Sequence, residues 1–150
     1  MSGQGLPQLK VISQENKNLS KVLHNIKENT WARIKPSKIH GVGVFAVRKI
    51  SSGTNLFPET KVNFDFITWN QLGTVAPGVR KMIHDFFVDN EFGFWCPDQS
   101  MNQLNLSFYL NHSTNPNCFH NDSGEIFAIK DIPIGQELTL NYSDFEEEVG

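Results

Sequence analysis

The sequence predicts a mainly β domain of the α+β class, and three observations support this. Short runs rich in β-branched and aromatic residues recur along the chain, separated by Gly, Pro, Asn and Ser turns. Helical periodicity is confined to two segments, near residues 19–28 and 77–90. Strands and helices do not alternate as a doubly wound parallel sheet would require. We therefore expect many short strands with one or two short helices.

Apolar spacing locates the individual elements. The polar flank of residues 1–29 is predicted to contain an amphipathic helix over residues 19–28, and apolar residues at i, i+3, i+4, i+7 and i+8 from Val79 predict a helix over residues 77–90. No element is assigned over residues 64–72, where polarity is mixed. We expect an extended segment at 92–96 and a helical turn within 103–110. Strands are predicted over residues 31–35, 42–47, 54–57, 118–120, 125–129 and 136–140, with turns at 51–53 and 121–124.

Length and composition limit the class of protein. The 150 residues suffice for one domain with its own core, and 39% hydrophobic with 19% charged residues is an ordinary globular balance. A net charge of −3, without any run of basic residues longer than two, gives no sign of direct nucleic-acid binding. No apolar stretch approaches the ~20 residues that span a bilayer, and no signal peptide is evident. We expect an intracellular protein with no membrane association, in either nucleus or cytoplasm.

The segment GVGVFA, from Gly41 to Ala46, matches the GxGxxA pattern of dinucleotide-binding folds. That pattern requires a helix directly after it, because the helix N-terminus holds the phosphates. Here the strand continues into a Ser-Ser-Gly turn at residues 51–53, so the context argues against a nucleotide site. Two interpretations remain: a tight turn that needs glycine dihedral angles, or glycines that let a ligand approach the backbone.

Cysteine and histidine residues are the candidates for a metal site or a nucleophile. Cys96, His112, Cys118 and His120 could supply four ligands, but their spacing matches no standard zinc pattern. We therefore expect no metal, and free thiols in a reducing compartment. A Cys-His nucleophile is also disfavoured, since no third residue is placed to orient the base.

The densest motifs lie between Ser107 and Tyr142. SFYLNHSTNPNC contains an Asn-His pair followed by an Asn-Pro-Asn turn, and GQELTLNY is a strand-like run that ends in Tyr142. Together with KIHGVGVFA, and in this order, these motifs resemble those of the SET-domain protein lysine methyltransferases. The resemblance covers about residues 30–145 and leaves an acidic tail at 146–150. It is to a compact member without a cysteine-rich tail after the domain.

The resemblance implies a fold of several small β-sheets with a C-terminal pseudoknot, in which the segment ending in Tyr142 threads through the Asn-His loop. S-adenosylmethionine would lie on one face, and a protein lysine would enter from the other. Tyr142 would be the catalytic residue, orienting the amine where the two meet. The implied cofactor-binding residues are His40, Gly41, Val42, Gly43, Asn111, His112 and Tyr142. The implied channel residues are Phe92, Phe94, Trp95, Tyr109, Leu140 and Phe145, with simple core packing as the alternative for the aromatic residues from 92 to 109.

Some positions depart from the family motifs. Phe108 stands where the family usually has Arg, Thr114 where it has Cys, and Asn141 where it has Asp. Leu140 occupies a position where many relatives carry an aromatic residue that limits methyl addition, so the methylation state stays open. Without a cysteine-rich flank, the channel would need Phe145, the N-terminal helix, a second subunit or further residues to complete it.

The function that the resemblance implies is methyl transfer from S-adenosylmethionine to a lysine of a protein, histone or non-histone, by a monomer or homodimer. The main alternative is a non-catalytic SET module that binds a protein partner. Methyl transfer to another acceptor is a third hypothesis, because a fold does not fix the acceptor. The acidic net charge is compatible with a basic substrate and does not select one.

Overall fold

The computed structural model describes residues 16–58, 60 and 62–145, and the chain divides into two units, residues 1–30 and 31–150. The described part of the first unit is mostly helix α1 (Asn16–Glu28), so the predicted amphipathic helix is confirmed and begins three residues earlier. Asn29 closes this helix, since its backbone N–H donates to the carbonyl oxygen of Asn25 at 3.0 Å. Among the described residues, no helix has the length and apolar character needed to cross a membrane.

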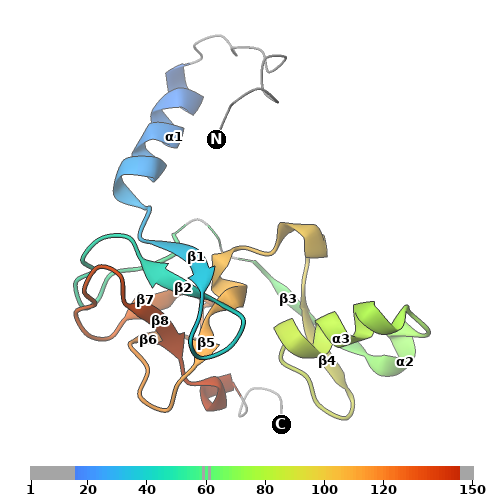
Figure 1. Cartoon of the computed structure of the whole chain (residues 1–150). Coiled ribbons are helices and arrows are strands. Elements are labelled where there is room, and N and C mark those ends of the chain that lie inside the picture. Colours follow the sequence, from blue (N-terminus) through green and yellow to red (C-terminus); the bar gives the residue numbers. More distant parts are fainter. Residues whose placement is uncertain (1–15, 59, 61, 146–150) are drawn as a thin grey trace. The chain divides into compact units, whose positions relative to one another are not determined.

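The second unit is mainly β and contains three small sheets (Figure 1). The largest has the strand order β1-β2-β8-β5, in which β8 pairs antiparallel with β2 and parallel with β5. The other two sheets are the antiparallel pairs β3–β4 and β6–β7. The predicted fold class, mainly β with a few short helices, is thereby confirmed. The strands are β1 (Ala32–Pro36), β2 (Val42–Ala46), β3 (Phe64–Thr68), β4 (Gly93–Pro97), β5 (Asn111–His112), β6 (Cys118–His120), β7 (Ile126–Ala128) and β8 (Glu137–Leu140).

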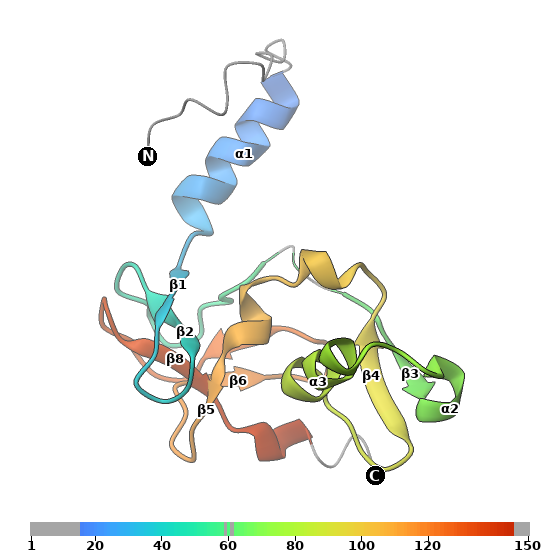
Figure 2. The same ribbon diagram turned by 45° about the vertical axis from the view of Figure 1, so that its right-hand side comes forward.

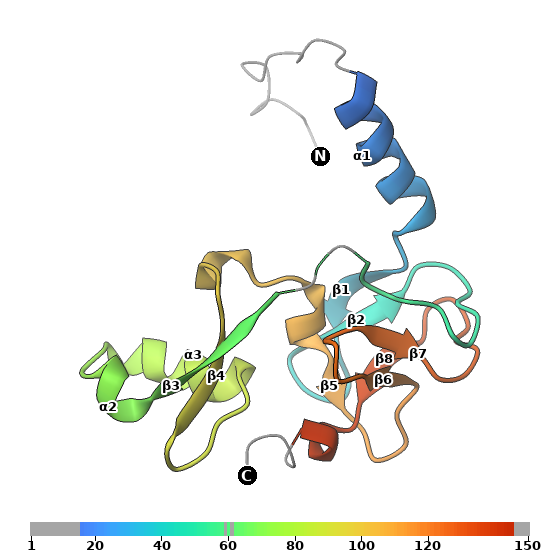
Figure 3. The same ribbon diagram turned by 180° about the vertical axis from the view of Figure 1, so that it is seen from behind.

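Short helices accompany the strands of the second unit. Helices α2 and α3 lie beside the β3–β4 pair, apart from the four-stranded sheet (Figures 2 and 3). Pro77 occupies the first turn of α3, where its missing N–H costs nothing. The helices are α2 (Trp69–Leu72) and α3 (Pro77–Phe86), with 3₁₀ turns η1 (Met101–Gln103), η2 (Leu106–Tyr109) and η3 (Tyr142–Phe145).

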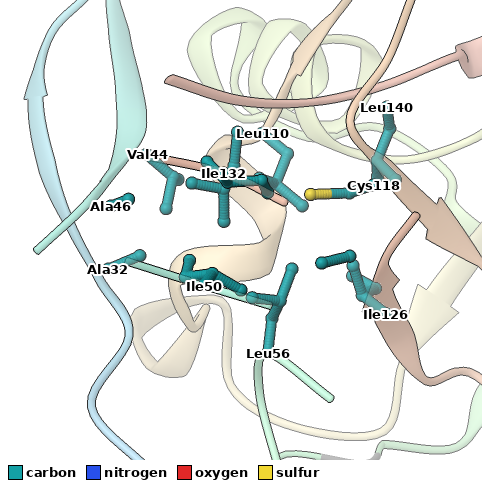
Figure 4. Close-up of a cluster of buried hydrophobic side chains, with 12 residues drawn as sticks. Ala32, Val44, Ala46, Ile50, Leu56, Leu110, Cys118, Ile126, Ile132 and Leu140 are labelled. Carbon is teal, nitrogen blue, oxygen red and sulfur yellow. The ribbon is translucent and has the colours of Figure 1, made fainter. Parts of the chain in front are cut away.

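Two hydrophobic clusters support this arrangement. The first lies between the four-stranded sheet and the β6–β7 pair, and its fully buried centre includes Val44, Ile50 and Leu138 (Figure 4). The second joins α3 to β4 through Ile83, Phe87 and Phe94. The unit therefore has one core under the four-stranded sheet, which carries the Asn-His pair, and another under the β3–β4 pair.

Three local predictions need correction. The strand predicted over residues 54–57 is only an isolated bridge between Asn55 and Phe127, because Asn55 Oδ1 accepts from the N–H of Phe57 and Pro58 then lacks a donor. The helix predicted over 77–90 ends at Phe86, because Phe87 is already extended. Strand β3 was not predicted, because it is half exposed and pairs with β4 alone, so its polarity does not alternate clearly.

Buried Asn117 supports strand β8 with side-chain hydrogen bonds, in place of those that a neighbouring strand would make. Only 4% of this residue is exposed. Its Nδ2 donates to the carbonyl oxygen of Glu137 at 2.8 Å, and its Oδ1 accepts from the N–H of Thr139 at 2.8 Å. These are the two bonds that a neighbouring strand would make, so one side chain satisfies the buried backbone of β8.

We predict that Asn117→Ala destabilises the protein by about 2 kcal/mol, because it leaves the buried N–H of Thr139 and the half-buried C=O of Glu137 without these partners. Urea unfolding followed by circular dichroism would measure the change. Asn115→Ala is the matched control: Asn115 is exposed, two residues away, and its loss should change stability by less than about 0.5 kcal/mol. Equal stability of the two variants would contradict the role given to Asn117.

Candidate active site

Asn111, the first residue of β5, connects this strand to the loop before β2. Its Nδ2 lies 3.1 Å from the carbonyl oxygen of His40 and 3.0 Å from that of Val42. Between them, Gly41 has a φ of +48°, a conformation that favours glycine, and its Cα faces open space. The structure thus brings together the loop and the Asn-His pair, two segments that the sequence proposed for the cofactor.

Gly43 serves a different purpose from Gly41. A Cβ atom on Gly43 would lie 2.2 Å from Oε2 of Glu137 and 3.1 Å from Nδ2 of Asn111. The close approach that this glycine permits is therefore made by a carboxylate of the same chain. Of the two interpretations of the glycine pair, Gly41 fits the tight turn, whereas the space at Gly43 is taken by Glu137 and not by a ligand.

Tyr142 lies two residues after the end of β8 and is fixed to the Leu110–His112 segment by two hydrogen bonds. Its backbone N–H donates to Nδ1 of His112 at 3.0 Å, and its hydroxyl donates to the carbonyl oxygen of Leu110. The rings of Tyr142 and His112 also lie 5.2 Å apart between centroids. Since Nδ1 of His112 accepts, a neutral ring carries its proton on Nε2. The parallel pairing of β5 with β8 creates this junction, because it places His112 opposite Leu140.

Tyr142 is 46% exposed as a residue, and the partial desolvation of its phenol affects its protonation. Desolvation raises the pKa of its phenol above the ordinary value of 10.0. The hydroxyl is therefore neutral throughout the physiological pH range. It can donate its proton to Leu110 and accept a further hydrogen bond, but it is not a phenolate base.

The aromatic residues proposed for a channel are divided between different surroundings. Phe94 is a core residue of the second cluster, 5.1 Å from Trp69 between ring centroids. Trp95 stands on the same strand, packs edge-on against Phe66 at 5.2 Å, and has a buried Nε1 with no hydrogen-bond partner in the described part of the chain. Phe92 is 67% exposed in the turn before β4. These three side chains belong to the β3–β4 pair.

The other proposed channel residues lie nearer to Tyr142 in the chain. Tyr109 precedes the carbonyl that binds the Tyr142 hydroxyl, packs against the first cluster, and meets Phe86 edge-on at 5.3 Å. Leu140 is 5% exposed and belongs to the first cluster. The side chain of Phe145 lies outside the described part of the structure.

The cysteine residues have inert surroundings. Cys118 is fully buried in the first cluster, and burial raises the pKa of its thiol to about 12. Burial also raises the pKa of the Cys96 thiol on β4, with a further contribution from the charge of Asp65. Both side chains are thus thiols rather than thiolate nucleophiles at neutral pH. Within the described ranges, no three His, Cys, Asp or Glu residues gather to hold a metal ion.

Three polar residues that shape the site were not identified from the sequence. Ser37 and Glu137 bind each other across the loop, and Asn117 supports β8. The glutamate lies within GQELTLNY, where an acid between turn and strand was the available signal. Nothing in the local sequence marks the bond of Ser37 to Glu137, because the two residues lie 100 positions apart.

Comparison with solved structures gives matches of low identity. A Plasmodium falciparum candidate histone methyltransferase matches with a TM-score of 0.48 and 18% identity, over 75% of this chain and 93% of that one. A humanised mutant of the Chaetomium thermophilum Polycomb Repressive Complex 2, bound to the inhibitor GSK126, matches with a TM-score of 0.49 and 24% identity. That match covers 83% of this chain, which spans only 17% of the other.

Comparison of sequences gives the family. No curated protein matches the sequence. A model of the SET domain matches residues 41–143, which is more than half of the chain and includes the loop, the Asn-His pair and Tyr142. The chain therefore belongs to the SET domain family.

Proposed function

We propose that the chain is a protein-lysine N-methyltransferase that uses S-adenosylmethionine as its methyl donor and acts on a lysine of a histone or another protein. SET-domain proteins are generally lysine methyltransferases, and the family uses this cofactor. The observation that carries the proposal is the junction at Tyr142, where a neutral hydroxyl is fixed beside the Asn-His pair.

The residues around the loop fit a cofactor of this chemistry. S-adenosylmethionine carries an ammonium and a sulfonium, and the carboxylate of Glu137 places a negative charge beside the loop without touching the cofactor, because it binds Ser37 and Asn111. His40, Gly41 and Val42 are exposed and can face a ligand, while their carbonyl oxygens accept hydrogen bonds from Nδ2 of Asn111 and the N–H of Ser37. The Asn111 amide nitrogen already has several acceptors within 3.1 Å. We therefore assign the cofactor contacts at β5 to the backbone of Asn111 and to His112.

The proposed chemistry depends on what Tyr142 does with its oxygen atom. The bound cofactor supplies a methyl group attached to a positively charged sulfur. The Tyr142 hydroxyl donates its hydrogen bond to the carbonyl oxygen of Leu110. Its oxygen therefore retains lone pairs that can accept a hydrogen bond from the lysine amine. This fixes the direction of the nitrogen lone pair, and such positioning supplies much of the acceleration in a transfer reaction. The same oxygen stabilises positive charge that develops nearby.

Tyr142 does not remove the proton from the lysine in this proposal. A free lysine has a pKa of about 10.4 and must become neutral before it reacts. The raised phenol pKa keeps Tyr142 protonated at neutral pH, so no phenolate is present to take the proton. Repulsion from a neighbouring cation and removal from water both lower the lysine pKa, so the proton can leave to solvent before transfer. The channel remains proposed from Phe92, Phe94, Trp95, Tyr109, Leu140 and Phe145.

We predict that Tyr142→Phe lowers the rate of methyl transfer about 100-fold, because it removes a positioned hydroxyl while keeping the ring. Transfer of radiolabelled methyl groups to core histones and to lysate proteins would measure it, with calorimetry for the cofactor. Binding of S-adenosylmethionine should persist in the variant.

Tyr109→Phe is the matched control, since it removes the other hydroxyl of the two tyrosines in the chain. A smaller loss in Tyr109→Phe than in Tyr142→Phe is expected. Equal transfer by wild type and Tyr142→Phe would overturn the role of Tyr142. Binding of cofactor without transfer to any protein would favour the non-catalytic module, and absence of both would reject the enzyme.

We also predict that the pKa of Tyr142 in the folded protein lies above its ordinary value of 10.0, because partial desolvation disfavours the phenolate. The absorbance of tyrosinate near 295 nm, recorded for wild type minus Tyr142→Phe, would isolate this group. The sign follows: folding resists ionisation, so the contribution of Tyr142 to stability is complete below pH 10 and is lost as the pH rises through the folded pKa. A midpoint below 10 in the folded protein would contradict the structure.

A further inference from the structure

We propose that Glu137 is a positioning residue, whose carboxylate holds the loop of residues 37–43 in the shape that receives the cofactor. This inference rests on the proposed function. Glu137 stands at the first position of β8, five residues before Tyr142. In this proposal it acts through Ser37 and Asn111 and does not itself touch the cofactor.

The carboxylate of Glu137 joins three distant segments of the chain. Its Oε1 and Oε2 lie 2.8 Å and 2.9 Å from the hydroxyl oxygen of Ser37, on the loop after β1. Oε2 also accepts from Nδ2 of Asn111, on β5, at 2.8 Å. Hydrogen bonds to an ionised carboxylate are shorter and about twice as strong as neutral ones. A single charge therefore ties the loop and the Asn-His segment to β8.

The charge also orients the hydroxyl of Ser37. A carboxylate only accepts, so Ser37 must donate its proton to Glu137. Its oxygen is then left with lone pairs that accept from the N–H of Ile39 at 2.9 Å and from the N–H of His40 at 3.4 Å. The N–H of Ser37 in turn donates to the carbonyl oxygen of Gly41 at 2.8 Å. Glu137 thus sets the direction of the Ser37 hydroxyl proton, and the hydrogen bonds that the Ser37 oxygen then accepts shape the exposed turn.

Gly43 provides the space for this arrangement. Any side chain at this position would put a Cβ atom 2.2 Å from Oε2 and 2.8 Å from Cδ of Glu137, so the carboxylate would have to leave. Gly43 and Glu137 therefore act together, because the missing side chain of the glycine leaves room for the carboxylate of the glutamate. An exposed turn has many accessible conformations, and fixing one of them before binding lowers the entropic cost of association.

The variant that tests this is Glu137→Gln, in which one of the two acceptor oxygens becomes an NH₂ group. Ser37 and Asn111 then compete for a single oxygen, and the new NH₂ group faces one of these two side chains, which are themselves donors. We expect binding of S-adenosylmethionine to weaken about tenfold by calorimetry, the scale of one lost charged hydrogen bond. We expect KM for the cofactor to rise similarly, with kcat changed less than threefold, because the contacts of Tyr142 with His112 and Leu110 remain.

Amide hydrogen exchange of the cofactor-free protein gives a second measurement, independent of activity. The N–H groups of Ile39 and His40 should exchange faster in Glu137→Gln and in Ser37→Ala than in wild type, and combining the two changes should add little. Gly43→Ala should have the same effects by displacing the carboxylate. Thermal unfolding of each variant would confirm that it is folded. If Glu137→Gln does not fold, Ser37→Ala provides the same test of the loop.

Glu125→Gln is the matched control, because Glu125 also accepts from two amides, those of Asn55 at 3.3 Å and Asn121 at 3.4 Å, beside β7. It should leave cofactor binding and exchange in the 37–43 loop unchanged. Equal behaviour of Glu137→Gln and Glu125→Gln in both measurements would overturn the proposal. Failure of the wild type to bind S-adenosylmethionine would instead reject the proposed function, and the exchange data would still show whether Glu137 holds the loop.

Discussion

The structure around the candidate site depends on how strand β8 is held. It lies inside the four-stranded sheet, with two residues paired to β2 and two paired to β5. Such short ladders leave buried backbone groups that must find other partners. The Asn117 amide supplies them, at Glu137 and Thr139. Because β8 begins with Glu137 and leads into Tyr142, the support that Asn117 gives sets the position of both ends of the site.

Side-chain amides do in this domain what long strands do in larger sheets. Asn117 imitates a neighbouring strand, and Asn111 joins a loop to two strands. Both are nearly buried, at 4% and 8% exposed, so a lost partner would leave a polar group unpaired in a medium of low dielectric. Networks of this kind fix one geometry more firmly than apolar packing does. A site that must orient two reactants to within a fraction of an ångström benefits from that rigidity.

Sequence patterns predicted the parts of this structure that are specified locally. Strand β6, both long helices and the turn at Gly124 follow from apolar spacing and turn residues, and the Asn-His and Tyr142 motifs identified the family. Strand β3 was missed because its exposed face carries no alternation. The bond between Ser37 and Glu137 was inaccessible for another reason: it joins residues 100 positions apart, and local sequence patterns do not reach that far.

The 3₁₀ turn η2 contacts both hydrophobic clusters of the domain and leads to Leu110, whose carbonyl oxygen binds the hydroxyl of Tyr142. Phe108 packs against Phe87 at 5.9 Å in the second cluster, whereas the next residue, Tyr109, packs against the first. Leu110 follows directly, and its carbonyl oxygen accepts from the hydroxyl of Tyr142. An arginine at position 108, as is usual in the family, could not fill an apolar cluster without a partner for its charge. Phe108 therefore packs against Phe64 of β3 and against Phe87, two residues before the carbonyl that binds the hydroxyl of Tyr142.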